Sequence, residues 1–222
     1  MLLAIDTSTY RAGVALYDGV QVAAEMIWTS HDHHTVELVP VIAEVLQRVG
    51  ITVADLVAVA VALGPGSFTG LRIGLAAAKG LAIGSHLPLL GIPTLDILAA
   101  AQPIRDLPMV AVLQAGRGRL AVGYYNVVAD GWSQVGSLQI KDVATLGHSI
   151  HSPTLVCGEL TEEERAILAR KRKNVLLATP AQSMRRPSFL AELAWKRWQA
   201  GQVDDPVTLA PIYLHIGEPI PA

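Results

Sequence analysis

The glycine-rich stretch GPGSFTG combines residue types that can hold an anion. Gly64, Gly66 and Gly70 permit positive φ angles and close approach of the backbone. Ser67 and Thr69 can cap a following helix, whose first N–H groups attract phosphate or carboxylate groups. The spacing matches neither the P-loop nor the dinucleotide-binding glycine pattern. The same glycines would let a helix pack closely on a strand, so the spacing leaves anion binding and packing open.

The chain has a second group of residues suited to phosphate, at the end of its first apolar segment. Asp6 could position a metal-bound water, and Thr7 and Ser8 could contact a phosphate, as could the backbone of Gly66. An Asx or Ser/Thr turn that shapes a hairpin uses the same residue types. Both interpretations stay open for these four candidate phosphate contacts.

The remaining chemically versatile residues are expected to have structural roles. His31, His33 and His34 lack the one-turn spacing of a helical zinc pair, so we expect a solvated loop in which Asp32 caps the next helix. Cys157 is the only cysteine and cannot form a disulfide or a thiolate metal site within the chain. We therefore predict no metal site. The acidic run 162–164 and the basic run 170–173 are predicted to be the solvated ends of one helix.

The order of elements predicts the fold. Three strands come first, and they are followed by a helix over 34–50, a buried strand over 57–63, a helix over about 69–83, a short strand and another helix. The order β-β-β-α-β-α-β-α is that of one actin-like, ribonuclease H-like α/β lobe. The prolines and charges of 101–108 suggest a boundary. We predict a first lobe over 1–102 and a smaller, truncated α/β lobe over 103–222, with a tail that can pack back on the first.

Composition restricts the function. The 222 residues are 51% hydrophobic and 16% charged, which indicates a globular protein whose apolar surface is suited to a protein partner. The net charge of −2 argues against strong general nucleic-acid binding. Residues 1–102 hold 4 basic and 8 acidic residues, so the front half is a poor surface for a polyanion. The start has no basic region typical of a signal peptide, and no apolar run could cross a bilayer, so we expect a cytoplasmic protein away from membranes.

Four segments together resemble one protein family. GPGSFTGLRIGLAAAKGLA closely resembles the TsaB (YeaZ) family of bacteria, and LLAIDTST, GIPTLDILAA and PIYLH are similar to its other motifs in the same order. His215 stands where the last motif usually has arginine. The resemblance covers nearly the whole chain. It implies an actin-like, two-lobed fold.

The resemblance also implies a function through binding. The family is a non-catalytic paralogue of TsaD, which transfers a threonylcarbamoyl group to adenosine 37 of tRNAs that read ANN codons. It implies a scaffold subunit that binds and activates TsaD, in an assembly with the ATPase TsaE, and that reaches tRNA only through this complex. The chain itself would need no cofactor. ATP or ADP is a candidate ligand at the boundary between subunits. A homodimer is conceivable when the chain is alone.

Comparison with TsaD explains why this chain would lack catalysis. TsaD binds its metal with a His-x-x-x-His pair, and the resemblance places Thr94 and Leu98 at those positions. The second lobe also departs from the family pattern. Gln114 stands where the family usually has an acid, and the arginines that follow are shifted to Arg117 and Arg119. Gly158-Glu159-Leu160 stands where the family usually has Gly-Asp-Gly.

The resemblance places the TsaD-binding surface on two helices of the first lobe. The expected interface residues are Val36, Val39, Pro40, Ala43, Gly64, Ser67, Phe68, Thr69, Gly70, Leu71, Arg72, Gly74, Leu75 and Ala78. A bulky charge at Gly74 or Ala78 is expected to abolish TsaD binding and to leave the monomer folded. The alternative is an actin-like ATPase or small-molecule kinase that uses Asp6 and the 64–70 loop. A metallopeptidase is disfavoured because the histidine pair is missing.

Overall fold

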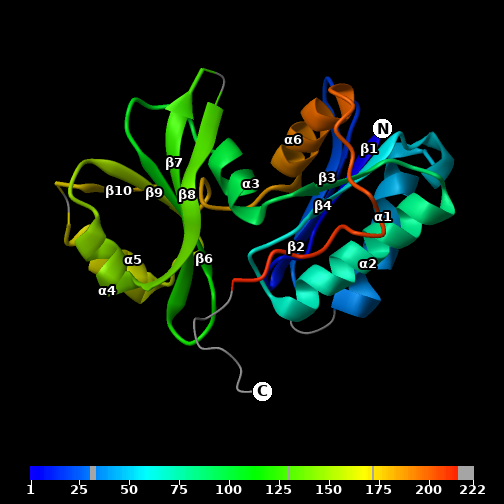
Figure 1. Cartoon of the computed structure of the whole chain (residues 1–222). Helices are drawn as coiled ribbons and strands as arrows, with labels where there is room; N and C mark the ends of the chain where they lie inside the picture. Colours follow the sequence, from blue (N-terminus) through cyan, green and yellow to red (C-terminus); the bar gives the residue numbers. More distant parts are fainter. Residues whose placement is uncertain (31–33, 130, 172, 215–222) are drawn as a thin grey trace. The chain divides into compact units, whose positions relative to one another are not determined.

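The chain folds into two α/β units (Figure 1). The computed structural model describes residues 1–30, 34–129, 131–171 and 173–214. The first unit comprises Met1–Ile97 and Arg185–Ile212, and the second contains Leu98–Met184. The division therefore falls before the expected 102/103 boundary, inside helix α3 (Thr94–Ala100). The expected second lobe, 103–222, also needs correction, because 185–212 belongs to the first unit.

The first unit is built on a mixed five-stranded sheet. Its strands are β1 (Leu2–Asp6), β2 (Arg11–Tyr17), β3 (Val22–Thr29), β4 (Ala58–Ala62) and β5 (Leu89–Ile92), in the order β3-β2-β1-β4-β5. The first three strands are antiparallel, and β1, β4 and β5 are parallel. β1 and β4 are fully buried because helices cover both faces of the sheet, which explains their continuous apolar sequences.

Side chains of β4 divide between two cores. Val59 and Val61 face α1 (His34–Val49) and α2 (Phe68–Gly84), which contact each other on one side of the sheet. The alanines of β4 face α6 (Pro187–Gln199) on the other side. A short 3₁₀ helix, Val53–Asp55, leads from α1 to β4. Because α6 buries its Leu190, Ala191 and Ala194 in this second core, it fixes the late segment of the chain to the first unit.

The second unit repeats this strand topology with shorter helices. Its strands are β6 (Met109–Gln114), β7 (Arg119–Val128), β8 (Gly131–Asp142), β9 (Thr154–Gly158) and β10 (Val175–Leu177), in the order β10-β9-β6-β7-β8. Helices α4 (Val143–Ser149) and α5 (Glu162–Ala169) cover one face. They have 7 and 8 residues, against 16 and 17 in α1 and α2. The predicted α/β class and the reduced second lobe are thus both present.

Candidate functional site

An apolar stripe lies on the outer side of α1. Val36 and Val39 expose 65% and 62% of their surface, and Pro40 and Ala43 are also exposed. These positions are three and four residues apart, so they share one face of the helix. The opposite face packs into the core through Leu38, Ile42, Val45 and Leu46. Four predicted interface residues are therefore accessible to a partner.

Helix α2 divides the other predicted interface residues into two sets. Ser67, Phe68, Thr69 and Arg72 are exposed at its amino-terminal end, where the Arg72 guanidinium lies 3.7 Å from the centroid of the Phe68 ring. The second set is buried within the first unit: Gly64, Gly70, Leu71, Gly74, Leu75 and Ala78. The prediction that these six residues contact a partner directly is wrong, because their side-chain positions face the core of this chain. A charge at Gly74 or Ala78 would therefore test folding instead of docking.

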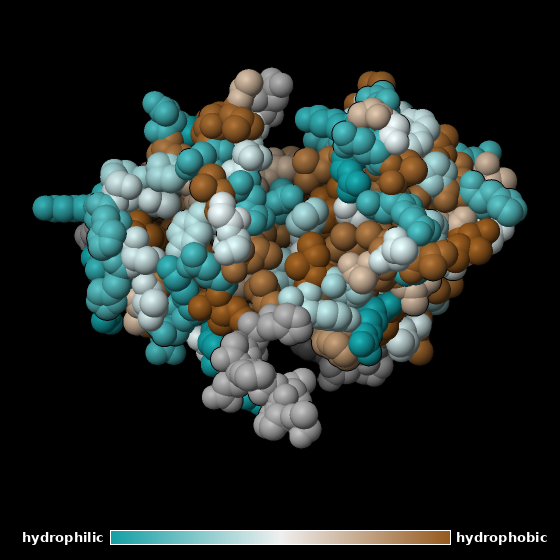
Figure 2. All heavy atoms as spheres, viewed as in Figure 1, coloured by the Kyte–Doolittle hydropathy of each residue, from teal (hydrophilic) through white to brown (hydrophobic). Residues whose placement is uncertain are grey.

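Three outward residues of α2 were missed by the sequence interpretation. Ala76 and Gly80 are exposed, and Ile83 exposes 59% of its surface. Steps of three and four from Phe68 reach Arg72, Ala76, Gly80 and Ile83, but α2 is apolar almost all round, so this spacing gave no distinct signal. We use the name docking face for ten exposed residues of the two helices: Val36, Val39, Pro40, Ala43, Phe68, Thr69, Arg72, Ala76, Gly80 and Ile83. In Figure 2 hydrophobic and hydrophilic side chains alternate at the surface over these helices.

Three glycines, Gly66, Gly70 and Gly74, allow a close contact inside the first unit. A Cβ on Gly66 or Gly70 would fall far inside contact distance of the carbonyl oxygens of Ser8 and Thr7, respectively. A Cβ on Gly74 would meet the Thr7 hydroxyl in the same way. The start of α2 thus lies directly on the turn that follows β1. The packing interpretation of the glycines explains all three positions.

Hydrogen bonds hold this contact together. The Thr7 hydroxyl donates to the carbonyl of Gly70 (2.7 Å), and the amide of Ser67 donates to the carbonyl of Ser8 (2.6 Å). The Ser67 hydroxyl also caps the helix by accepting from the amide of Gly70. Ser8 shares a hydrogen bond with the hydroxyl of Thr94 (2.8 Å). Thr7 and Ser8, two candidate phosphate contacts, therefore have partners within the chain.

Asp6 has an internal cationic partner. The Arg185 Nε donates to Asp6 Oδ2 (2.6 Å), and the amide of Ser8 donates to Asp6 Oδ1 (2.8 Å). Both side chains of the ion pair are buried, with 1% and 2% exposed. A second nitrogen of Arg185 donates to the Thr9 hydroxyl and to the carbonyl of Arg11. Sequence reasoning had no local signal for Arg185, because it follows Asp6 by 179 residues.

The two residues that the resemblance places at the metal-ligand positions of TsaD are buried, and a leucine side chain cannot ligate a metal. Thr94 and Leu98 are both fully buried, and the Thr94 hydroxyl accepts a hydrogen bond from the amide of Gly64 (2.9 Å). In the ranges that the structure describes, no group of three or more His, Cys, Asp or Glu side chains could hold a metal. His31 and His33 lie outside the described residues, and His34 begins α1.

Cys157 is unsuited to chemistry. It is fully buried in β9, and burial raises the pKa of its thiol to about 12. At neutral pH the residue is therefore a neutral thiol without nucleophilic character. Among the described helices, none is long and apolar enough to span a bilayer.

Two of the family departures in the second unit, Gln114 and Glu159, belong to one hydrogen-bonded cluster. The Gln114 amide donates to Glu164 Oε2 (2.7 Å) and to the carbonyl of Glu159 (3.2 Å). Glu164 also accepts from the amide of Thr161, which completes the capping box of α5. An acid at position 114 would face this carboxylate, so the neutral amide matches its surroundings. Arg117 is exposed in the β6–β7 turn with φ 54°, and Arg119 begins β7.

A Gln114→Glu substitution tests this cluster. Two carboxylates in contact would lower the stability at pH 7 by about 1–3 kcal/mol. Repulsion raises the pKa of the introduced carboxyl above its unfolded value, so its proton is retained on folding at lower pH. The deficit should therefore appear as the pH rises through the folded pKa and shrink toward pH 4. Urea unfolding of both proteins between pH 4 and 8 measures the difference, and a pH-independent deficit would contradict the contact.

Comparison with known proteins identifies the family. The family model described as TsaD, tRNA N6-adenosine threonylcarbamoyltransferase, matches residues 22–184. The TsaB protein of Bacillus subtilis, named for tRNA threonylcarbamoyladenosine biosynthesis, is 32% identical over 98% of this chain and 95% of its own length. A threonylcarbamoyltransferase of Streptococcus mutans is 45% identical, over 38% of this chain and 26% of its own length.

Solved structures show the fold. YeaZ from Pseudomonas aeruginosa superimposes with a TM-score of 0.80 at 23% identity, covering 96% of this chain and 99% of that one. The dehydratase activator of Clostridium difficile, solved with bound ADPNP, has a TM-score of 0.52 at 9% identity, covering 92% of this chain and 98% of its own. The expected actin-like fold is thereby confirmed. The full-length match to the Bacillus protein places this chain in the TsaB (YeaZ) family of tRNA threonylcarbamoyladenosine biosynthesis proteins.

Proposed function

We propose that this chain is a non-catalytic scaffold subunit, which binds the threonylcarbamoyltransferase TsaD through the docking face and activates it. The observation that carries the proposal is the exposed apolar stripe on two adjacent helices. Four of its residues are Val36, Val39, Phe68 and Ile83, which each leave more than half of their surface exposed. Ala76 and Gly80 lie on the same side of α2 and allow a partner helix to approach closely. Burying such a face would remove apolar area from water.

The geometry of the β1 turn supports a role through binding and not through catalysis. An actin-like ATPase or kinase would need Asp6 and the 64–70 loop to face a nucleotide. Here Arg185 and the amide of Ser8 occupy both carboxylate oxygens of Asp6. Gly66 and Gly70 of the loop lie against the backbone of Ser8 and Thr7. No observation on the described residues favours the ATPase alternative.

The wider assembly follows from the same proposal. TsaD would supply the chemistry, TsaE would join the complex, and the complex would act on position 37 of tRNAs that read ANN codons in the cytoplasm. The chain would need no cofactor of its own, and ATP or ADP would bind at most where subunits meet. The apolar docking face also accounts for a homodimer when TsaD is absent, because it would otherwise face water.

Co-purification with TsaD tests the docking face. Ala76→Arg is expected to abolish recovery of tagged TsaD after co-expression, because a long charged side chain replaces a methyl group at the centre of the α2 stripe. Val20→Arg is the matched control, since Val20 is 91% exposed in the β2–β3 hairpin, away from both helices. Both variants should melt within about 2 °C of the parent protein, because neither position packs in the core.

Two results would overturn the proposal. Retention of TsaD by Ala76→Arg would show that the surface is wrong. Full tRNA modification by TsaD and TsaE without this chain would show that the scaffold role is wrong.

A further inference from the structure

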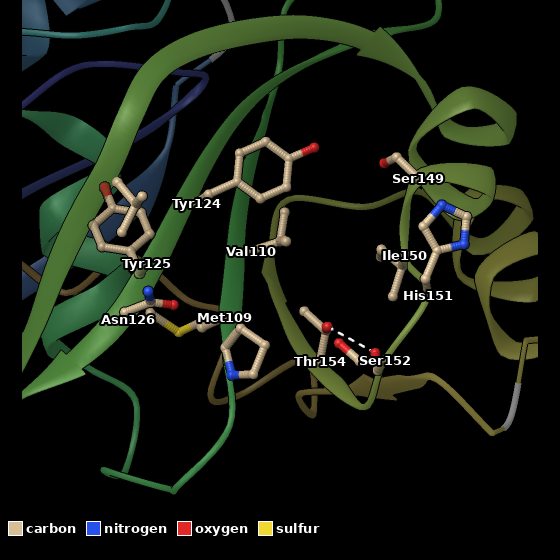
Figure 3. Close-up of a pocket in the computed structure, with 12 residues that line it drawn as sticks. Met109, Val110, Tyr124, Tyr125, Asn126, Ser149, Ile150, His151, Ser152 and Thr154 are labelled. Carbon is tan, nitrogen blue, oxygen red and sulfur yellow. Dashed lines mark hydrogen bonds between the residues drawn. The ribbon is translucent and has the colours of Figure 1, made fainter.

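We propose that the second unit holds a pocket for one base of a single-stranded RNA segment. The pocket has a volume of about 440 Å³ and lies where β6 and β9 begin (Figure 3). Its apolar surface includes Met109, Val110 and Ile150. Tyr124 and His151 lie on opposite sides of it, and the Tyr124 hydroxyl points toward Ser149. The inference does not depend on TsaD binding.

The pocket exists because the helical layer ends before the sheet does. On β7, Leu120 and Val122 are fully buried in the core beneath Leu146 of α4 and Leu168 of α5. Tyr124 is the next residue on the same face of β7, but it is only partly buried, because α4 stops at Ser149. The β7–β8 register also shifts between Val122 and Tyr124. Such bulges re-aim side chains and are frequent beside binding sites.

Tyr124 is placed to stack on a planar group. The Lys141 ammonium donates to its hydroxyl (2.8 Å) and lies 5.3 Å from the ring centroid. These two distances place the ammonium beyond the hydroxyl and not over the ring face. The lysine thus fixes the ring and adds positive charge at its edge. Aromatic side chains on which bases stack are the common feature of single-strand binding proteins.

A turn with basic side chains, which follows α5, lies beside the pocket. The Asn174 side-chain amide donates to the carbonyl of Ile150 (3.4 Å), and the amide of Thr154 donates to the carbonyl of Asn174 (2.9 Å). Asn174 in turn bonds the carbonyl of Lys171, so the turn after α5 lies against the pocket edge. Its basic side chains in the described sequence are Arg170, Lys171 and Lys173, and His148 precedes the pocket residue His151.

Among the residues of this unit that the structure describes, the acidic groups lie mainly at the other end. Glu162, Glu163 and Glu164 form the first turn of α5, Glu159 follows β9, and Asp142 caps the start of α4. Near the pocket, Asp106 follows Arg105 in the loop that leads to Pro108. The pocket end is therefore basic even though the whole chain has a net charge of −2. This charge pattern favours a polyanion over a peptide.

The location favours a polymer base over a nucleotide cofactor. In α/β sheets, cofactors bind at the carboxyl ends of parallel strands. This pocket lies at the amino ends of β6 and β9, and its polar groups include Asn126, Ser149 and Ser152. These can hydrogen-bond the edges of a base, while phosphates of neighbouring nucleotides meet the basic turn. The inference revises the expectation that the chain reaches tRNA only through its complex.

Fluorescence anisotropy with fluorescein-labelled oligouridine and oligoadenosine 12-mers tests the proposal on the full chain. Tyr124→Ala should weaken binding by about tenfold, whereas Tyr124→Phe, which keeps the ring, should stay within about twofold. The double variant Lys171→Gln/Lys173→Gln should make the slope of log K against log[salt] less steep by about 1.4, because two phosphate contacts are lost. Lys196→Gln on α6 is the charge control and should leave binding unchanged.

Each alternative outcome decides against the pocket. Binding that Tyr124→Ala does not weaken would reveal non-specific charge attraction only. Equal competition by free uridine or adenosine monophosphate would indicate a nucleotide site. If Tyr124→Ala still binds RNA but no longer co-purifies with TsaD, the pocket is a protein-docking site. Because Tyr124 is outside the docking face, TsaD recovery should be normal, and thermal melting identifies any variant that fails to fold.

Discussion

Replacing Arg185 by methionine is expected to lower the free energy of unfolding by about 3–5 kcal/mol. The substitution keeps much of the side-chain volume but removes the guanidinium that bonds Asp6, Thr9 and the carbonyl of Arg11. Asp6 would then stay buried with its charge uncompensated, which is the costly way to break a buried ion pair. Urea unfolding followed by circular dichroism measures the loss.

A double-mutant cycle separates the ion pair from the packing of Arg185. Asp6→Asn/Arg185→Met should recover part of the stability that Arg185→Met loses, because no buried charge remains. The matched control is Arg186→Met, since the Arg186 side chain is 51% exposed and its partner Glu25, 13% exposed, keeps the hydrogen bond from the amide of Ser188. It should cost about 1 kcal/mol or less. A similar small effect at Arg185 would disprove the buried clamp.

The same clamp bears on the ATPase alternative. If Asp6 is a structural anchor, then purified parent protein and Asp6→Asn should both fail to hydrolyse ATP above the background, and only stability should differ between them. Asp6-dependent turnover without any partner would establish an enzyme. That result would also contradict the scaffold proposal, whereas a change in stability alone would leave it intact.

Gly70→Ala is expected to destabilise the chain by about 2–3 kcal/mol. The new Cβ would overlap the carbonyl oxygen of Thr7, and a backbone atom cannot rotate away as a side chain can. Either the start of α2 must move off the turn after β1, or the hydrogen bond from the Thr7 hydroxyl to Gly70 must break. Thermal and urea unfolding of the variant measure the cost.

Gly80→Ala provides the matched comparison in the same helix. A Cβ on Gly80 meets no atom within 4 Å, and alanine is the better helix former by about 0.5–1 kcal/mol. This variant should therefore be at least as stable as the parent. Equal losses at both positions would show that the glycines matter through helix propensity alone. Unequal losses in the expected direction would assign Gly70 to close packing.

These two predictions concern one structural feature, the turn over residues 6–9. Arg185 bonds Asp6 and Thr9, and α2 packs on Thr7 and Ser8. Residue types that could have served a phosphate thus fasten the late segment and the glycine-rich helix to β1. The outward side of α2 is then held at a defined position by its inward side. A rigid support of this kind suits a surface whose proposed work is to bind.

The sequence by itself determined the class of fold and the family. Turn residues, the buried run of β4, the helical period of α1 and the capping residues before α2 are local signals, and each predicted its element in the first unit. The second unit was harder. Strand β8 and helix α4 escaped notice because β8 is largely exposed and has no apolar alternation, so its position depends on pairing with β7. The sequence predicted a truncated α/β relative of the first lobe here, but the complete repeat of the five-strand order required the structure.

Only the tertiary structure decided which side of α2 faces a partner. Its sequence is apolar almost all round, so periodicity could not separate Gly74 and Ala78, which pack inward, from Ala76 and Gly80, which face solvent. It also decided the partner of Asp6, because an ion pair across 179 residues leaves no local pattern. Local propensity follows from neighbouring residues, but burial and charge pairing depend on where the folded chain brings distant segments together.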